Sequence, residues 1–489
     1  MTVVAKSSKK NTRYWINTII VLFCFFGFGL LPEMFGLNYA GMRAIGIFIG
    51  LLWGWITIEF GWVSLLGIIA MGTTGAMSIT DAIQQSFLST TFLQLVFPMI
   101  LLAYLGKSGF SDWVAFKLLS RNFLKGHPWR IVTMLFVVAS ILCLLVTTFP
   151  MIFLMWSIFM GIADVLGYEK KDKFVGYVMC GIVMMQSIIA SSVPWSFYPI
   201  TLQSLMSDYL NGMAFPFVPI LALGIIGQIV TIVVYLLVGK FILRVDVSKL
   251  QKLPDDFYKK AETIHLTKEG KLGAGLMIVF ILCMSIPSIF PNLPISPFLT
   301  ELGLHGVAIM LLGAFLVLRN KQGKPFSSTG ELANLGLSWE ITFLVTSTLF
   351  LAALIKLPEV GILEKITAAL VPVVSQLSPT VFIIVTILIF WVVTQLTHNF
   401  VIVLTLVGAL SGVCVQLGIN PWLFGWMFMC CMNLAYCTPA ASSPGAMFYG
   451  SDWVSRKDAY VCGTVFSFFC LIAFLIFMLP LAKVMFGAI

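Results

Sequence analysis

The chain of 489 residues is 60% hydrophobic and only 10% charged, which leaves too few polar side chains to cover a soluble globule. This composition indicates an all-α polytopic membrane protein, because an open sheet cannot satisfy its backbone in lipid. The net charge of +9 does not indicate a nucleic-acid partner, since the basic residues fall in loops where they would face anionic membrane lipid.

Apolar segments of about 20 residues, the length that crosses a bilayer, recur along the chain. The first follows a basic stretch, Lys6 to Arg13, and has no clear cleavage site, so we interpret it as an uncleaved span with a cytoplasmic N-terminus. The ten cysteines lack metal-ligand spacing and are expected to be reduced packing residues. The eleven expected spans lie near residues 15–35, 43–58, 61–78, 88–107, 174–206, 217–243, 272–290, 301–318, 335–357, 422–452 and 460–486.

Two further apolar segments, 130–165 and 378–417, are each interrupted near the middle by polar residues. If each enters and leaves on one side, the Lys and Arg clusters of the loops all fall in the cytoplasm, as the positive-inside rule requires. We therefore predict an inside and an outside re-entrant hairpin, which are allowed where broken backbone is buried in protein or lines a watery cavity. The C-terminus is then expected outside a bacterial cytoplasmic (inner) membrane.

The chain contains a weak copy of itself, shifted by 251 positions. Thr91-Phe92-Leu93 recurs at 342–344, and Ala190-Ser191-Ser192 recurs at 441–443. The same shift carries Thr147-Thr148-Phe149, in the first hairpin, onto His398-Asn399-Phe400 in the second. Five spans separate the copies, so the second is inverted. Inverted repeats with broken helices are typical of secondary transporters, whose substrate site lies at the repeat interface.

These features divide the chain into five parts. In chain order they are an N-terminal region with the first scaffold helices (1–87), a first repeat with hairpin 130–165 and broken helix 174–206 (88–243), a cytoplasmic linker (244–271), scaffold helices (272–334), and a second repeat with hairpin 378–417 and broken helix 422–452 (335–489).

The broken helices combine small hydroxyl residues with proline or glycine, at Ala190 to Pro194 and at Ala441 to Gly445. Such breaks leave helix N-termini that favour anions, and carbonyl and hydroxyl oxygens that suit Na⁺. The other interpretation is that these residues only bend the helices or let them approach closely. No Lys or Arg is expected at this depth, so a co-transported cation would offset the charge of an anion. For His398 two interpretations stay open, a protonated carboxylate- or proton-binding group and a neutral group that hydrogen-bonds across the hairpin.

Two segments, Ala441-Ser-Ser-Pro-Gly-Ala-Met-Phe-Tyr-Gly450 and Trp55-Ile-Thr-Ile-Glu59, resemble signatures of the divalent anion/sodium symporter family, the INDY-type di- and tricarboxylate transporters. The resemblance covers essentially the whole chain. It implies a homodimeric secondary active transporter of small organic anions, of the di- or tricarboxylate class, with the family's Na⁺ coupling and its elevator movement of a transport domain against a scaffold. No intramembrane carboxylate pair, His-Glu metal motif or Ser-His-Asp set indicates an enzyme.

The resemblance also implies site residues. The substrate site falls on Thr147, Thr148, Ser192, His398, Asn399 and Ser443. The second Na⁺ site falls on Thr394, Thr397, Asn399 and Ala441, with backbone carbonyls at 397 and 441. The first Na⁺ site would fall on Cys143, Thr147, Thr148 and Ala190, where a thiol, a poor ligand for a hard cation, replaces a hydroxyl.

Both hairpin tips differ from the Ser-Asn-Thr of that family, since each ends in phenylalanine, Phe149 or Phe400. Two other functions therefore stay open. One is a proton-coupled carrier or an anion exchanger in which His398 replaces the Na⁺ chemistry. The other is a carrier of a different anion, such as sulfate or an amino-acid derivative.

Overall fold

The structure, a computed structural model, describes residues 2–34, 36–145, 148–210, 213, 215–254, 265–337, 339–362, 365, 377–396, 398–439 and 441–487. Within these ranges every regular element is a helix, which confirms the predicted all-α fold. Nine of the described helices are long and apolar enough to cross a membrane, or ten if a pair bent by 42° within 79–107 is one span. Seven of the nine match expected spans, and the other two, Pro128–Leu145 and Pro379–Leu396, are arms of the expected hairpins.

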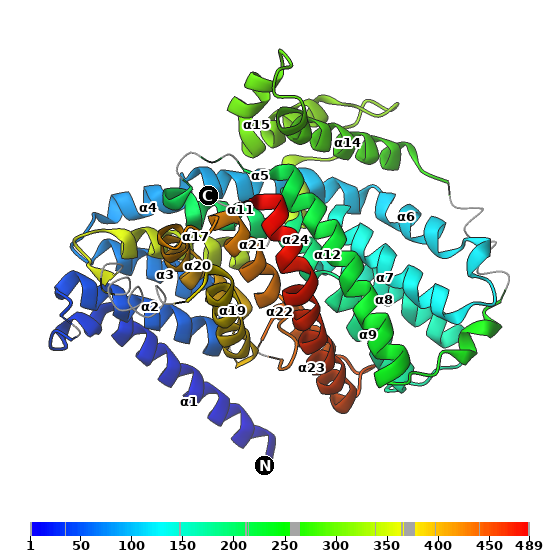
Figure 1. Cartoon of the computed structure of the whole chain (residues 1–489), viewed down its shortest axis with the longest axis horizontal. Helices are drawn as coiled ribbons and strands as arrows, with labels where there is room; N and C mark the ends of the chain where they lie inside the picture. Colours follow the sequence, from blue (N-terminus) through cyan, green and yellow to red (C-terminus); the bar gives the residue numbers. More distant parts are fainter. Residues whose placement is uncertain are drawn as a thin grey trace.

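The N-terminal helices form a hydrophobic core of their own. Helix α1 (Thr2–Leu22) continues through a π-helical turn and is followed by α2 (Tyr39–Thr57) and α3 (Gly61–Gly72). These helices pack against α17 (Trp339–Lys356), which belongs to the second half of the chain. The start of α1 extends away from the rest of the molecule (Figure 1).

The two predicted hairpins are helix pairs with matching bounds. The first consists of α7 (Pro128–Leu145) and α8 (Thr148–Val165), and the second of α19 (Pro379–Leu396) and α20 (Asn399–Gln416). Within each pair the two helices contact one another. All four bounds of the second pair equal those of the first displaced by 251 residues. The helices therefore reproduce the shift seen in the sequence.

Both predicted broken helices are interrupted. The first is divided into α9 (Lys173–Met184), α10 (Ser187–Ser192) and α11 (Phe197–Met206). The second is divided into α21 (Pro421–Met432) and α22 (Ser443–Gly450). Between α21 and α22 the described residues are not helical, so their backbone polar groups need partners outside a helix.

In each repeat, one short helix precedes the first long helix. The two short helices are α4 (Ile79–Phe87) before α5 (Thr90–Lys107), and α16 (Thr329–Gly336) before α17. In α4 the Ser78 hydroxyl accepts from the backbone N–H of Asp81 at 3.1 Å, and in α16 Ser328 accepts from Glu331 at 3.2 Å. Both are N-caps that satisfy a free N–H of the first turn.

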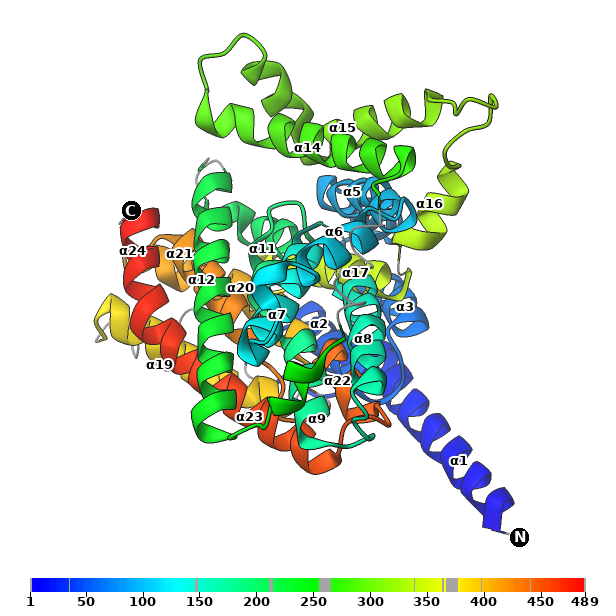
Figure 2. The same ribbon diagram turned by 90° about the vertical axis from the view of Figure 1, so that its right-hand side faces the viewer.

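The remaining helices cover the repeats. Helix α6 (Phe110–Leu119) follows α5, and α12 (Phe217–Leu237) runs beside α23 (Arg456–Ala473), which continues through a π turn into α24 (Leu479–Phe486). Helices α14 (Lys268–Ile289) and α15 (Ser296–Val317) form a layer at one side of the molecule, against α5 (Figures 1 and 2). The predicted linker 244–271 is described only up to Pro254 and from His265. All ten cysteines are described and free of disulfides.

Candidate functional site

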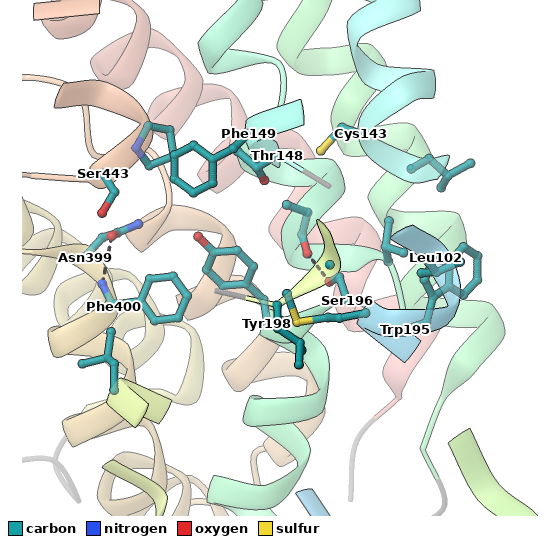
Figure 3. Close-up of a pocket in the computed structure, with 18 of the residues that line it drawn as sticks. Leu102, Cys143, Thr148, Phe149, Trp195, Ser196, Tyr198, Asn399, Phe400 and Ser443 are labelled. Carbon is teal, nitrogen blue, oxygen red and sulfur yellow. Dashed lines mark hydrogen bonds between the residues drawn. The ribbon is translucent and has the colours of Figure 1, made fainter. Parts of the chain in front are cut away.

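Four helices begin at one cavity between the hairpins and the broken helices. The cavity has a volume of about 360 Å³ (Figure 3). Helix α8 begins there at Thr148, α20 at Asn399 and α22 at Ser443, and α11 begins between the lining residues Ser196 and Tyr198. The N-terminus of a helix carries free N–H groups and a partial positive charge. Four such ends at one cavity favour an anion.

The side chains that line this cavity are neutral. Among the described lining residues there is no Asp, Glu, Lys or Arg. The lining side chains that carry oxygen or nitrogen are those of Thr148, Trp195, Ser196, Tyr198, His398, Asn399 and Ser443, and most of the remaining wall is carbon. An anion here would be held by helix ends, hydroxyls and amides rather than by an ion pair.

His398 joins the second hairpin to the second broken helix. Its Nδ1 accepts from the backbone N–H of Phe400 at 3.3 Å, and its Nε2 lies 2.9 Å from the hydroxyl of Ser443. Because Nδ1 accepts, we assign the proton of a neutral imidazole to Nε2, which donates to Ser443. This geometry fits the neutral interpretation of His398, and a proton on Nδ1 would remove an N-cap of α20.

Each hairpin tip hydrogen-bonds an amide side chain at the end of the helix that faces it. The Thr148 hydroxyl donates to Oε1 of Gln186 at 3.3 Å, just after α9. Asn399, the residue that matches Thr148 in the second repeat, donates from Nδ2 to Oδ1 of Asn433 at 2.6 Å, just after α21. The two repeats therefore hold their tips in the same way, with different side chains.

The same two amides connect the repeats to each other. Nε2 of Gln186 donates to the hydroxyl of Tyr436 at 2.6 Å, and that hydroxyl lies 2.7 Å from the hydroxyl of Ser187. Asn433 donates to the hydroxyl of Ser191 and, at 3.4 Å, to the carbonyl of Ser187. A buried chain of polar groups thus runs from one hairpin tip to the other, where the low dielectric strengthens each bond.

The non-helical segment after α21 forms hydrogen bonds with α19. The carbonyl of Leu434 accepts from Nε1 of Trp391 at 3.2 Å and from Nε2 of Gln395 at 3.1 Å. Oε1 of Gln395 accepts from the N–H of Cys437 at 3.0 Å. The backbone carbonyl of Gln395 accepts from the hydroxyl of Thr438 at 2.6 Å. Side chains of the hairpin therefore satisfy the backbone that leaves the helix.

Most predicted site residues that the structure describes meet at the cavity. Those that line it are Cys143, Thr148, Ala190, His398, Asn399 and Ser443. Ser192 does not reach it, because its hydroxyl is buried and accepts from Nε1 of Trp426 at 3.0 Å. Thr147 and Thr397 lie outside the described residues.

The predicted second Na⁺ site has one oxygen without a partner. The hydroxyl of Thr394 is buried and has no hydrogen-bond partner in the described part of the chain. The carbonyl of Ala441 accepts from the N–H of Asn399 at 2.8 Å, and Oδ1 of Asn399 accepts from the N–H of Phe400 at 2.9 Å. A carbonyl or amide oxygen has a second lone pair, so these atoms still fit a hard cation.

The predicted first Na⁺ site is poorer in free oxygen. The carbonyl of Ala190 accepts from the hydroxyl of Ser196 at 2.5 Å, and Thr148 donates to Gln186. Cys143 contributes a thiol, which does not suit Na⁺. Within the described residues, no cluster of three or more His, Cys, Asp or Glu side chains could hold a metal ion.

The residues missed at the sequence level are mainly two buried amides and the aromatic side chain of Tyr198. Gln186 and Asn433 stand next to the breaks in otherwise apolar segments, and a polar residue at such depth is itself a signal of function. The ring of Tyr198 packs on Phe400 with 4.7 Å between ring centres, and its hydroxyl lies near Asn399 and Asn433.

A family model described as a citrate transporter, CitMHS, matches residues 48–320. The match covers more than half of the chain. This chain belongs to the citrate transporter family. It is accordingly a secondary carrier of citrate-like anions in a membrane. The matched residues include the first hairpin and Ala190 but not the second hairpin, and no curated protein matches the chain.

Proposed function

We propose that this member of the citrate transporter family carries di- or tricarboxylates such as citrate across a bacterial inner membrane, and binds them in the cavity between the two hairpins. The observation that carries the proposal is the meeting of four helix N-termini at a cavity with neutral walls. The N–H groups of Asn399, Phe400 and Gly445 already have acceptors, so the other N–H groups of these helix ends and the Ser443 hydroxyl would hold the carboxylates.

A cation would travel with the anion, because the described wall offers no cationic side chain to offset its charge. Na⁺ is the cation that we propose, at the second site formed by Thr394, Thr397, Asn399 and Ala441. The buried and unpartnered hydroxyl of Thr394 supports this choice, since an unsatisfied buried oxygen is costly unless a ligand completes it.

Transport would follow an elevator movement in a homodimer. The hairpins and broken helices would move as one unit, since the polar chain from Thr148 to Asn399 ties them together. Helices α1 to α3 share a separate hydrophobic core with α17 and would belong with it to the static part. This mechanism is that of the divalent anion/sodium symporters, which the sequence resembles.

Uptake of labelled citrate into proteoliposomes tests the proposal. We expect uptake that is driven by an inward Na⁺ gradient and absent when choline replaces Na⁺, with empty liposomes as the control. Citrate uptake driven by a proton gradient alone would favour the proton-coupled alternative, and uptake that depends only on internal anion would favour an exchanger. No uptake of any di- or tricarboxylate would contradict the proposed substrate class.

A further inference from the structure

The polar and apolar parts of the cavity wall lie at different ends. Asn399 and Ser443 lie at one end, and Leu102 and Trp195 lie at the other (Figure 3). Thr148 and Ser196, between them, already bond Gln186 and the carbonyl of Ala190. The polar binding capacity of the wall is therefore concentrated where α20 and α22 begin.

The apolar end is a built wall rather than a loose surface. Trp195 is only 4% exposed and packs on Phe217 and Phe280, with ring centres 6.1 and 5.8 Å away. Next to Leu102, the short helix α16 ends at Gly336, where a Cβ would lie only 2.4 Å from the carbonyl oxygen of Met99. This close approach fixes the partly buried Leu337 beside α5 on the wall of the cavity, where Leu335 is 57% exposed.

At this end the indole Nε1 of Trp195 is a buried donor without a partner among the described residues, and the rest of the wall formed by Leu102, Leu335 and Leu337 is carbon. A carboxylate placed there would exchange most of its hydration for carbon. A purely polar anion would bind at only one end of the cavity, and the apolar wall at the other end would remain in contact with water. An apolar group placed there would instead be removed from water, which is favourable. Between the ends, the rings of Tyr198 and Phe400 both line the cavity, with an angle of 36° between their planes, and a planar group can pack on either ring.

We infer that the site selects an amphipathic carboxylate, whose carboxylate groups bind at the end formed by His398, Asn399 and Ser443. Its apolar or aromatic group, of about the size of one ring, lies toward Leu102 and Trp195. The inference rests on the proposed function, because it takes the cavity as the anion site. It adds a preference among carboxylates that the family match does not contain.

Binding of a matched pair of probes tests the inference. Succinate and phenylsuccinate carry the same two carboxylates and differ by one ring, and calorimetry on the purified full-length protein with Na⁺ gives both affinities. We expect phenylsuccinate to bind at least tenfold more tightly. Tighter binding of succinate would overturn the inference while the proposed function stands. Binding of neither probe, nor of citrate, would overturn both.

A variant locates the ring within the cavity. Leu102→Phe fills part of the apolar end without adding a polar group, so the protein should fold. We expect it to weaken the binding of phenylsuccinate at least fivefold and to leave the affinity for succinate within about twofold, with Leu102→Met as the conservative control. Unchanged phenylsuccinate binding, or an equal loss for both probes, would contradict the placement. The thermal unfolding of each variant without ligand checks that the fold is kept.

Discussion

Nε2 of Gln186 donates a hydrogen bond to the hydroxyl of Tyr436 at 2.6 Å, and so joins the break of the first repeat to the break of the second. Both side chains are buried and 250 positions apart in the sequence. Gln186 also accepts from Thr148. On the other side, Tyr436 contacts the hydroxyl of Ser187, whose carbonyl accepts from Asn433, and Asn433 accepts from Asn399. The two hairpin tips that form the cavity are therefore held in one polar chain.

Removing the Tyr436 hydroxyl should destabilise the protein. Tyr436→Phe leaves the buried amide of Gln186 without its acceptor, at an expected cost of about 1–3 kcal/mol in the free energy of unfolding. Unfolding in detergent measures the change. Tyr104→Phe is the matched control, because the hydroxyl of Tyr104 is buried and unpartnered within the described residues, so its loss should cost little. Equal effects of the two substitutions would contradict a structural role for the Gln186 bond.

Ser192 and Ser443 should separate stability from binding. Ser192→Ala leaves Nε1 of Trp426 without an acceptor, so we expect lower stability and unchanged affinity for citrate. Ser443→Ala removes a hydroxyl at the cavity and the acceptor of the half-buried Nε2 of His398, so we expect affinity to fall about 2- to 10-fold, with a smaller loss of stability than for Ser192→Ala. Binding titrations and thermal unfolding of both variants provide the comparison. The reverse pattern would show that the cavity is not the binding site.

His398→Asn should preserve the pH dependence of transport. Asparagine is a good N-cap whose oxygen can accept from the backbone as Nδ1 of His398 does, and it cannot exchange a proton near neutral pH. We expect the pH profile of citrate uptake to keep its shape between about pH 5.5 and 8, the range around the ordinary histidine pKa in which an imidazole would titrate. A flattened profile would indicate that His398 carries the proton and would favour the proton-coupled alternative. His398→Leu, which lacks any acceptor for Phe400, serves as the damaging control.

An ion pair between Lys107, at the end of α5, and Glu331 of α16 predicts an effect of pH on stability. Nζ of Lys107 lies 2.6 Å from Oε2 of Glu331, and its hydrogen bond, with help from Ser327, lowers the pKa of Glu331. A lowered pKa in the folded state means that the pair stabilises the protein above the ordinary glutamate pKa. That contribution is lost as the pH falls through the lowered value.

We therefore expect Glu331→Gln to lower the melting temperature slightly at pH 7, and the difference from the unsubstituted protein to vanish in acid. Added salt should also reduce the difference, because the pair is partly exposed. Glu301→Gln, on an exposed carboxylate of α15, is the control for charge alone. A difference that grows as the pH falls would have the wrong sign for this pair.

Local patterns in the sequence were sufficient to predict the helical class, the two interrupted apolar segments and the breaks near Ala190 and Ala441. Each of these depends on residues close together in the chain, since a polar interruption in an apolar run is visible without any partner. The matching bounds of the hairpin helices show that the weak shift of 251 residues has a structural counterpart.

Partnerships across the repeats could not be predicted in this way. Ser192 and Ser443 occupy matching positions in the same Ala-Ser-Ser sequence, yet one lies under Trp426 and the other lines the cavity. The difference arises from packing: a Cβ on Gly224 would lie only 2.2 Å from that of Ser192, so α12 closes over the first break. Contacts such as Gln186 with Tyr436 join residues whose pairing has no local pattern.

The most direct test of the account places a negative charge among the four helix N-termini. Ser443→Asp adds a carboxylate at the first residue of α22, where the helix end should tolerate it. Ser443→Asn has nearly the same shape without the charge. With citrate titrated into each purified variant, we predict that Ser443→Asp binds at least tenfold more weakly than Ser443→Asn, while both melt near the temperature of the unsubstituted protein. Equal affinities for citrate would contradict the claim that this cavity is the anion site.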